Sequence, residues 1–183
     1  MIYHLSLPVA GFVCGLVLLL VSAFALLGAN SSRTSVARFP RSKSAGIALL
    51  SVDLVWSFWL LATMEMGEFS SFRRPLLIAL PIAFFLILKF VDEFLAVRAL
   101  GILFLLAAEP LLEAAFFRYE ISRLLVTVFA YILIVEGLLW VMMPYLLRDQ
   151  ISWSTRSLGR WRIFGVLCLG YAAAVFACAF TLY

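Results

Sequence analysis

Five ionisable side chains lie inside long apolar runs of the sequence: Asp53, Arg98, Glu109, Glu113 and Glu136. An ionised group buried in an apolar medium is expensive, so each of them needs a partner, a wet cavity or, for an acid, a bound proton. The chemistry open to them is proton or cation binding, an ion pair, or a hydrogen bond that orients two helices.

Asp53 and Arg98 are expected to form an ion pair between two helices. Asp53 lies about eight residues into one apolar run and Arg98 about five residues into another, so at 1.5 Å per residue their depths differ by about 4–5 Å. An arginine side chain covers that difference. Such a pair would serve mainly to orient the two helices.

Glu109 and Glu113 flank Pro110 in the same run as Arg98. Arg98 and Glu109 are eleven residues apart, close to three helical turns, so they share one helix face. Pro110 removes a backbone hydrogen bond and is expected to kink the helix. The two carboxylates then form either a vestibule for cations or protons, or a frayed helix end that is exposed to water.

Glu136 is the most isolated charge, because the nearest Lys or Arg along its run is twelve or more residues away. It is expected to be protonated, paired across helices or placed at a wet site, and to face the bundle rather than lipid. A structural hydrogen bond to a neighbouring helix and a role as a proton relay both stay open.

The residue types give little support for metal binding, catalysis or nucleotide binding. His4 is the only histidine, and no set of residues has the spacing of a metal site, a catalytic triad or a nucleotide-binding loop. The cysteines are expected to be small packing residues in apolar runs. We therefore expect no metal, no cofactor and no enzymatic activity.

The composition indicates the element class that must position these residues. The chain has 183 residues, of which 66% are hydrophobic and only 13% are charged, and its mean hydropathy is +1.12. A soluble domain is about 45–50% apolar and about 25% charged. These numbers exclude a soluble globule, a disordered chain and a disulfide scaffold, and they predict an all-α polytopic membrane protein.

Six apolar stretches are long enough to span a bilayer, for which about 20 residues are needed. The first is interpreted as a retained transmembrane helix rather than a signal peptide, because no Lys or Arg precedes it. The six expected helices, in three hairpins of a single domain, are at 8–27, 45–66, 75–90, 94–117, 124–147 and 163–182.

The basic residues predict the orientation. The first, third and fifth loops hold nine Lys and Arg residues, and the second and fourth hold four. Positive loops face the cytoplasm, so both termini are expected on the non-cytoplasmic side, with cytoplasmic loops at 29–44, 89–93 and 148–162. These loops suit membrane lipids rather than nucleic acid.

Seven residues are expected to contact lipid headgroups: Arg38, Arg41, Lys43, Arg156, Arg160, Trp153 and Trp161. In the last loop they suit a short amphipathic segment lying on the inner leaflet, with a docking surface for a cytoplasmic partner as the alternative. Helix packing is expected at two pairs of small residues four apart, Gly11 with Gly15 and Gly170 with Ala174.

The last third of the chain resembles the YjeT-type family of small bacterial inner-membrane proteins of unknown function. The matching elements are Glu136-Gly137-Leu138, Pro144, Ile151-Ser152 and a basic, aromatic and glycine-containing piece at Arg162, Phe164 and Gly165. The resemblance covers roughly 50 residues, about 130–183, and implies a bacterial inner membrane.

Two functions are compatible with these observations. The first is a non-enzymatic accessory or structural subunit of a larger inner-membrane assembly, with protein subunits in the membrane as partners. The second is a small transporter or channel that uses the intramembrane acids as a proton or cation path.

Overall fold

A computed structural model describes residues 3, 5–91, 94–116 and 123–181, with the side chain of Thr181 left aside. His4, residues 92–93 of one expected loop and the expected helix ends at 117 and 182 lie outside the described residues. The elements in chain order are α1 (Leu7–Leu27), α2 (Ala29–Arg38), η1 (Phe39–Arg41), α3 (Lys43–Thr63), η2 (Gly67–Phe72), α4 (Arg73–Phe90), α5 (Leu95–Ala115), α6 (Arg123–Met142), α7 (Tyr145–Thr155) and α8 (Leu158–Thr181).

The fold is all-α and polytopic. Six helical stretches of 20 to 24 residues are apolar enough to cross a membrane, and they correspond to the six that were expected. No strand occurs in the described ranges. The prediction of a multi-pass helical membrane protein is confirmed.

Local residues set several of the helix limits. Pro8 lies in the first turn of α1, where its missing N–H is harmless. Ser42 caps α3, since its Oγ accepts a hydrogen bond from the backbone N–H of Ala45 at 3.3 Å. Gly67, with φ at +52°, begins η2 in the left-handed region, which glycine adopts without strain.

Two segments that were expected to be loops are largely helical. Residues 29–44 contain α2, which ends before Pro40, and residues 148–162 contain most of α7 and the start of α8. Pro144 is the N-cap of α7, so the chain turns there and the span expected to reach 147 ends at Met142. α8 begins at Leu158, five residues before the expected start at 163.

The long helices pack as α1 with α8, α5 with α6, and α3 with α4 and α5. Glycines allow the closest approaches: a Cβ atom added to Gly101 would lie 2.8 Å from the carbonyl oxygen of Gly137, and the reverse distance is also 2.8 Å. A Cβ atom on Gly46 would lie 2.8 Å from the backbone nitrogen of Ala96. The expected hairpins, each closed by a cytoplasmic loop, are not confirmed, because α1 packs mainly on α8 at the other end of the chain.

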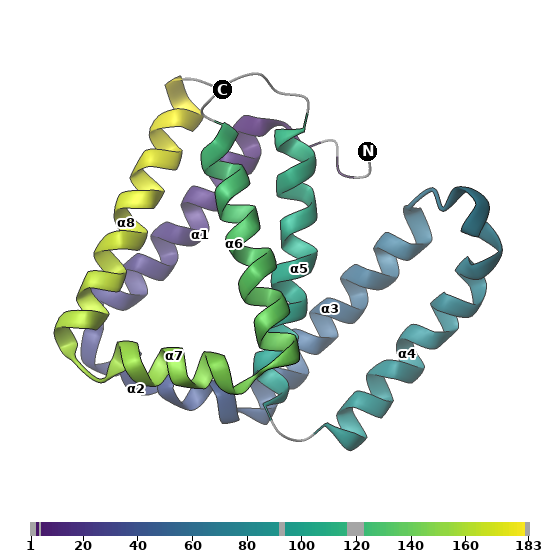
Figure 1. Ribbon diagram of the computed structural model, residues 1–183, viewed down its shortest axis with the longest axis horizontal. Coiled ribbons are helices and arrows are strands. Elements are labelled where there is room, and N and C mark those ends of the chain that lie inside the picture. Colours follow the sequence, from purple (N-terminus) through teal and green to yellow (C-terminus); the bar gives the residue numbers. More distant parts are fainter. Residues whose placement is uncertain (1–2, 4, 92–93, 117–122, 182–183) are drawn as a thin grey trace.

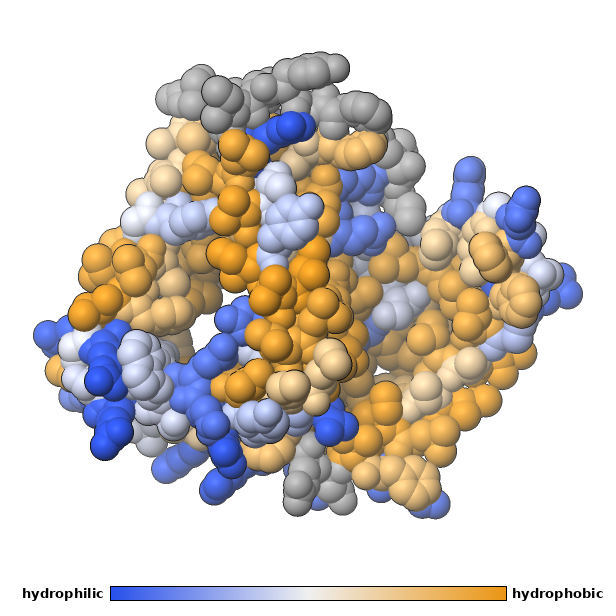
Figure 2. Space-filling view, in the orientation of Figure 1, coloured by the Kyte–Doolittle hydropathy of each residue, from blue (hydrophilic) through white to orange (hydrophobic). Residues whose placement is uncertain are grey.

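The two best-packed pairs form a frame. α2 and α7 lie side by side and connect the α1–α8 pair to the α5–α6 pair, as Figure 1 shows. At the opposite end the four helices meet in an apolar core that includes Cys14, Leu111, Ala130 and Val175. Between these two ends the pairs diverge, and Figure 2 shows an opening between α8, α7 and α6.

The α3–α4 hairpin projects to one side of this frame (Figure 1). α3 touches α5 near its first turns, where Leu50 packs against Leu95 and Ala99. None of the residues of α4, all of which are described, is buried. The hairpin is therefore held mainly through the beginning of α3.

Candidate functional site

The candidate site is the space between α3 and α5 beyond their contact at Gly46. The two helices run in the same direction and separate toward the end opposite α2 and α7 (Figure 1). We use the name α3–α5 opening for the part of this helix pair that diverges, and we define it by Asp53 and Trp56 on α3, Glu109 and Glu113 on α5, and Tyr3, which makes hydrogen bonds to both helices. Three of the five predicted intramembrane charges lie there.

Asp53 is the middle residue of the 21-residue helix α3, and its side chain is 3% exposed. Neither carboxylate oxygen has a hydrogen-bond partner among the described residues. Asp53 is also the last buried residue of α3, after Gly46 and Leu50, so it marks the point where α3 leaves α5.

The predicted ion pair between Asp53 and Arg98 is wrong for this structure. Arg98 is the fourth residue of α5 and is half-buried, and its Nε atom also has no hydrogen-bond partner within the described ranges. The depth estimate compared positions along two helix axes only. Gly46 sits beside Ala96, so Asp53, seven residues on, is level with residues about one turn beyond Arg98.

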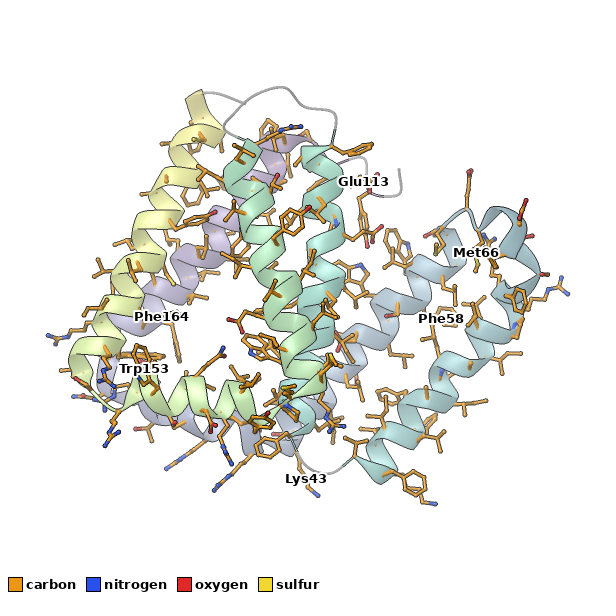
Figure 3. All side chains as sticks on the ribbon, in the orientation of Figure 1. Lys43, Phe58, Met66, Glu113, Trp153 and Phe164 are labelled. Atoms are coloured by element: carbon orange, nitrogen blue, oxygen red, sulfur yellow. The ribbon has the colours of Figure 1, made fainter. Side chains whose placement is uncertain are left out.

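Glu109 and Glu113 lie on the wall of the opening that α5 provides. Ile102 packs against the cluster around Leu50, and Glu109 follows it by seven residues, close to two turns, on the same face. Figure 3 shows Glu113 on the side of α5 that faces α3. The two carboxylates also line an open groove of about 530 Å³, whose other walls are residues of α5 and its C-cap and Ile134 of α6, and which no residue of α3 lines.

Tyr3 bridges the two walls near the wide end of the opening. Its backbone N–H donates to Oε2 of Glu113 at 3.3 Å, and its hydroxyl accepts a hydrogen bond from Nε1 of Trp56 at 2.7 Å. Its ring lies 5.5 Å from that of Trp59, centroid to centroid. Burial raises the pKa of the Tyr3 hydroxyl, and the carboxylates of Glu109 and Glu113 act in the same direction.

α5 continues through Pro110 without interruption, from Leu95 to Ala115. Arg98, Glu109 and Glu113 therefore belong to one helix, as their spacing required. Glu109 is exposed and Glu113 is half-buried. The acids thus border an accessible groove, and the choice between a vestibule and a water-exposed helix end stays a prediction.

Glu136 lies on α6, outside the α3–α5 opening, and is half-buried. Its two carboxylate oxygens accept hydrogen bonds from Nε2 of Gln150 on α7, at 3.3 and 3.0 Å. Oε1 of Gln150 in turn accepts from Nε1 of Trp140 at 3.1 Å. Glu136 therefore makes a hydrogen bond to a neighbouring helix. This was one of the two roles expected for it.

The basic residues expected at lipid headgroups are exposed: Arg38, Arg41, Lys43, Arg156 and Arg160. Trp153 is 63% exposed, and the guanidinium of Arg160 lies 4.8 Å from the centre of its ring. Figure 3 shows Trp153 at the α7 end of the frame and Lys43 at the start of α3.

Trp161 is buried, unlike the other six residues, so its expected contact with lipid headgroups is wrong. It is 5% exposed, and its Nε1 donates to Oγ of Ser32 at 3.2 Å. Its ring is buried because α8 begins earlier than expected and carries Trp161 against α2.

The predicted packing residues divide into two groups. Gly11 and Gly15 are buried in α1, and a Cβ atom on Gly15 would lie 3.0 Å from the ring of Phe176 on α8. Gly170 and Ala174 of α8 are exposed, and a Cβ atom on Gly170 would meet nothing within 4 Å. The first pair packs inside the chain and the second does not.

Sequence reasoning missed Gln150, Tyr3, Trp56 and Arg33. Arg33 of α2 donates from its Nε and Nη2 atoms to the backbone oxygen of Thr155, the last residue of α7, with the Nε bond at 3.0 Å. A basic side chain at a helix C-terminus suits the free carbonyls there. Only the reversal of the chain at Pro144 could have pointed to Gln150, since it returns the chain toward Glu136.

In chemical terms, the α3–α5 opening combines a buried carboxylate with two more accessible ones, which is suited to a positively charged partner. No group of three or more His, Cys, Asp or Glu side chains that could hold a metal ion occurs in the described part of the chain. No family model, curated protein or solved structure matches this chain.

Proposed function

We propose that the protein is a non-enzymatic accessory or structural subunit of a larger inner-membrane assembly. The observation that carries this proposal is the α3–α4 hairpin, because no residue of α4 is buried. Helices associate in lipid through close packing rather than through a hydrophobic effect, so a helix gains stability only from neighbours that fit it. α4 has few such neighbours in its own chain, which supports a helix of another protein as its partner.

The small-residue face of α8 supports the same proposal. Gly170 and Ala174 are exposed, and close helix approach in membranes uses residues of this kind. The corresponding residues of α1, Gly11 and Gly15, are already buried within the chain.

We further propose that the chain sits in a bacterial inner membrane with α2 and α7 on the cytoplasmic side and both termini on the other side. The positive-inside rule and the exposed arginines around these helices support this orientation. The resemblance of residues 130–183 to the YjeT-type family supports the type of membrane. Exposed Trp153 and Arg160 suit the headgroup region.

Purification in a mild detergent tests the main proposal. We expect the tagged protein to elute as a complex with a second membrane protein in a fixed ratio, as measured by size-exclusion chromatography with light scattering. Photo-reactive side chains placed at Ile82 on α4 and at Gly170 on α8, both of which are exposed, should cross-link to that protein and so map the interface. Elution as a lone monomer or homo-oligomer would contradict an accessory role.

A small proton- or cation-coupled transporter is the second candidate. The observation that favours it is the set of three carboxylates around the α3–α5 opening, one of them buried without a hydrogen-bond partner within the described residues. The purified protein in liposomes would then give a pH-dependent flux that Asp53→Asn abolishes. A flux of this kind from the protein alone would replace the first proposal.

A further inference from the structure

The surroundings of Asp53 do not explain how its carboxylate is stabilised inside a membrane-spanning helix. It lies at the middle of a membrane-spanning helix, is 3% exposed, and has no hydrogen bond to either carboxylate oxygen in the described part of the chain. An ionised carboxylate in this position without a partner strongly destabilises the fold. Either a bound proton or a positively charged partner removes this cost, and the ranges that the structure describes supply no such partner.

The charges around the opening favour a positively charged partner. Glu109 and Glu113 add two carboxylates on the α5 wall, while the nearest basic residue on that helix, Arg98, lies closer to the α2–α7 end and makes no ion pair with Asp53. Tyr3 contributes a hydroxyl that already accepts from Trp56. Among the described residues that define the opening, three are acidic and none is basic.

The geometry provides access from one side. α3 and α5 are in tight contact at Gly46, where an added Cβ would lie 2.8 Å from the backbone of Ala96, and they separate beyond Asp53. On the face of α3 that carries Asp53, the residues one and two turns further on, Trp56, Ser57 and Leu60, are only half-buried, so this face becomes accessible beyond Asp53. A long, flexible basic side chain can reach a buried carboxylate from this surface even where a backbone cannot.

We infer that Asp53 pairs with a Lys or Arg side chain carried by a transmembrane helix of a second protein, which packs along the α3–α5 opening. This inference rests on the proposed accessory function and names the chemistry of its partner. Intramembrane charges that face a bundle are paired with one another, and such a pair fixes both the depth and the rotation of the incoming helix. The carboxylate of Glu109 on α5 favours the same sign of charge in the incoming side chain.

Synthetic transmembrane helices test the pairing. The probes are two Leu- and Ala-rich peptides that differ only at the central position, which is Lys in one and norleucine in the other. Energy transfer between labelled peptide and labelled full-length protein is measured in phosphatidylcholine vesicles. We expect the Lys peptide to bind about three- to tenfold more tightly than the norleucine peptide, which is the range of an interhelical polar contact in lipid.

Two variants make the test specific. Asp53→Asn keeps the size of the side chain and removes its charge, so the preference for Lys should fall below about twofold. Glu136→Gln changes another intramembrane carboxylate that already accepts from Gln150, and it should leave the preference unchanged. Equal binding of both peptides to the wild-type protein, as expected if Asp53 only holds a proton, overturns the inference. A preference for Lys that survives Asp53→Asn overturns it as well.

Asp53→Asn also distinguishes a failure of the pairing at Asp53 from a failure of the proposed accessory function. If a second membrane protein copurifies with the wild type and is lost from Asp53→Asn, both stand. If it copurifies equally with Asp53→Asn, the accessory function stands and the pairing at Asp53 is wrong. If no protein copurifies with either chain, the accessory function itself fails.

Discussion

Two carboxylates within apolar helices differ in whether a hydrogen-bond donor lies next to them, and this determines their effect on stability. Glu136 accepts two hydrogen bonds from Gln150, whereas Asp53 accepts none from the described residues. A hydrogen bond contributes about 0.5–1.5 kcal/mol net, toward the low end where the donor is exposed as Gln150 is, while a buried acceptor left without a donor destabilises by about 1–3 kcal/mol. The two side chains therefore act on stability in opposite directions.

Glu136 should tolerate an amide but not an apolar side chain. Glu136→Gln keeps an oxygen that accepts from Gln150, so the melting temperature in detergent should change little. Glu136→Leu removes that acceptor from the exposed Gln150 amide and should destabilise by about 0.5–1 kcal/mol. Thermal unfolding followed by circular dichroism distinguishes them, and an equal loss in both variants would show that the Gln150 contact contributes nothing.

Replacing Asp53 should stabilise the isolated protein. Asp53→Leu removes a buried carboxylate whose oxygens accept no hydrogen bond from the described residues, and such an unsatisfied buried group destabilises by about 1–3 kcal/mol. We therefore expect a higher melting temperature in detergent. A lower melting temperature would mean that Asp53 is satisfied inside the chain, and would also argue against an external partner.

The sequence allowed these residues to be found but not paired. Charge inside an apolar run is visible in the sequence, so all five intramembrane candidates were identified. The offset of α3 along α5 is set by the Gly46 contact, which depends on side-chain fit and is not visible in hydropathy. The Asp53–Arg98 pair failed for that reason, and the Gln150 contact was missed because α7 folds back toward α6.

At the scale of elements, the spans were predictable and the segments between them were not. The apolar length needed to cross a bilayer constrains each span, so the six expected ranges overlap the six observed ones. Residues 29–44 and 148–162 are too polar for a span, and their helices α2 and α7 are fixed by contacts such as Arg33 with Thr155 and Trp161 with Ser32. Polar composition alone does not distinguish such helices from loops.

The contact between α5 and α6 should depend on glycine at positions 101 and 137, because neither residue has a Cβ atom. Gly137→Ala places a Cβ atom 2.8 Å from the carbonyl oxygen of Gly101, so the helices must separate, and we expect a loss of about 1–3 kcal/mol in stability. Gly170→Ala is the matched control, because nothing lies within 4 Å of its added Cβ. In a helix this change should be neutral or stabilise by up to about 1 kcal/mol.

Unfolding of both variants in the same detergent tests this expectation. Equal stability of Gly137→Ala and Gly170→Ala would show that α5 and α6 do not approach as closely as described. If Gly170→Ala left the isolated protein unchanged but weakened a copurifying subunit, the small-residue face of α8 would be part of that interface.

At the scale of the whole molecule, the order of the helices along the sequence does not indicate which helices pack together. α1 and α8 pack together although they lie at opposite ends of the sequence, and hydropathy gives no information about which span meets which. The exposed basic residues, by contrast, gather where α2 and α7 connect the helix pairs, as the loop charges suggested. The charge distribution therefore distinguishes one end of the bundle from the other, while the orientation of that end toward the cytoplasm stays a prediction.

That orientation can be tested with cysteines placed at the two ends of the frame. Ser35 on α2 and Ser71 on η2 are both exposed, and they lie at opposite ends of the adjacent helix α3. In a chain whose three native cysteines are replaced, an impermeant thiol reagent added outside intact cells should modify Ser71→Cys and leave Ser35→Cys unmodified until the membrane is opened. The reason is that nine Lys and Arg residues in the odd loops resist transfer across the membrane, against four in the even loops. Labelling of Ser35→Cys from outside, with Ser71→Cys protected, would invert the molecule and place α2, α7 and their arginines on the non-cytoplasmic side.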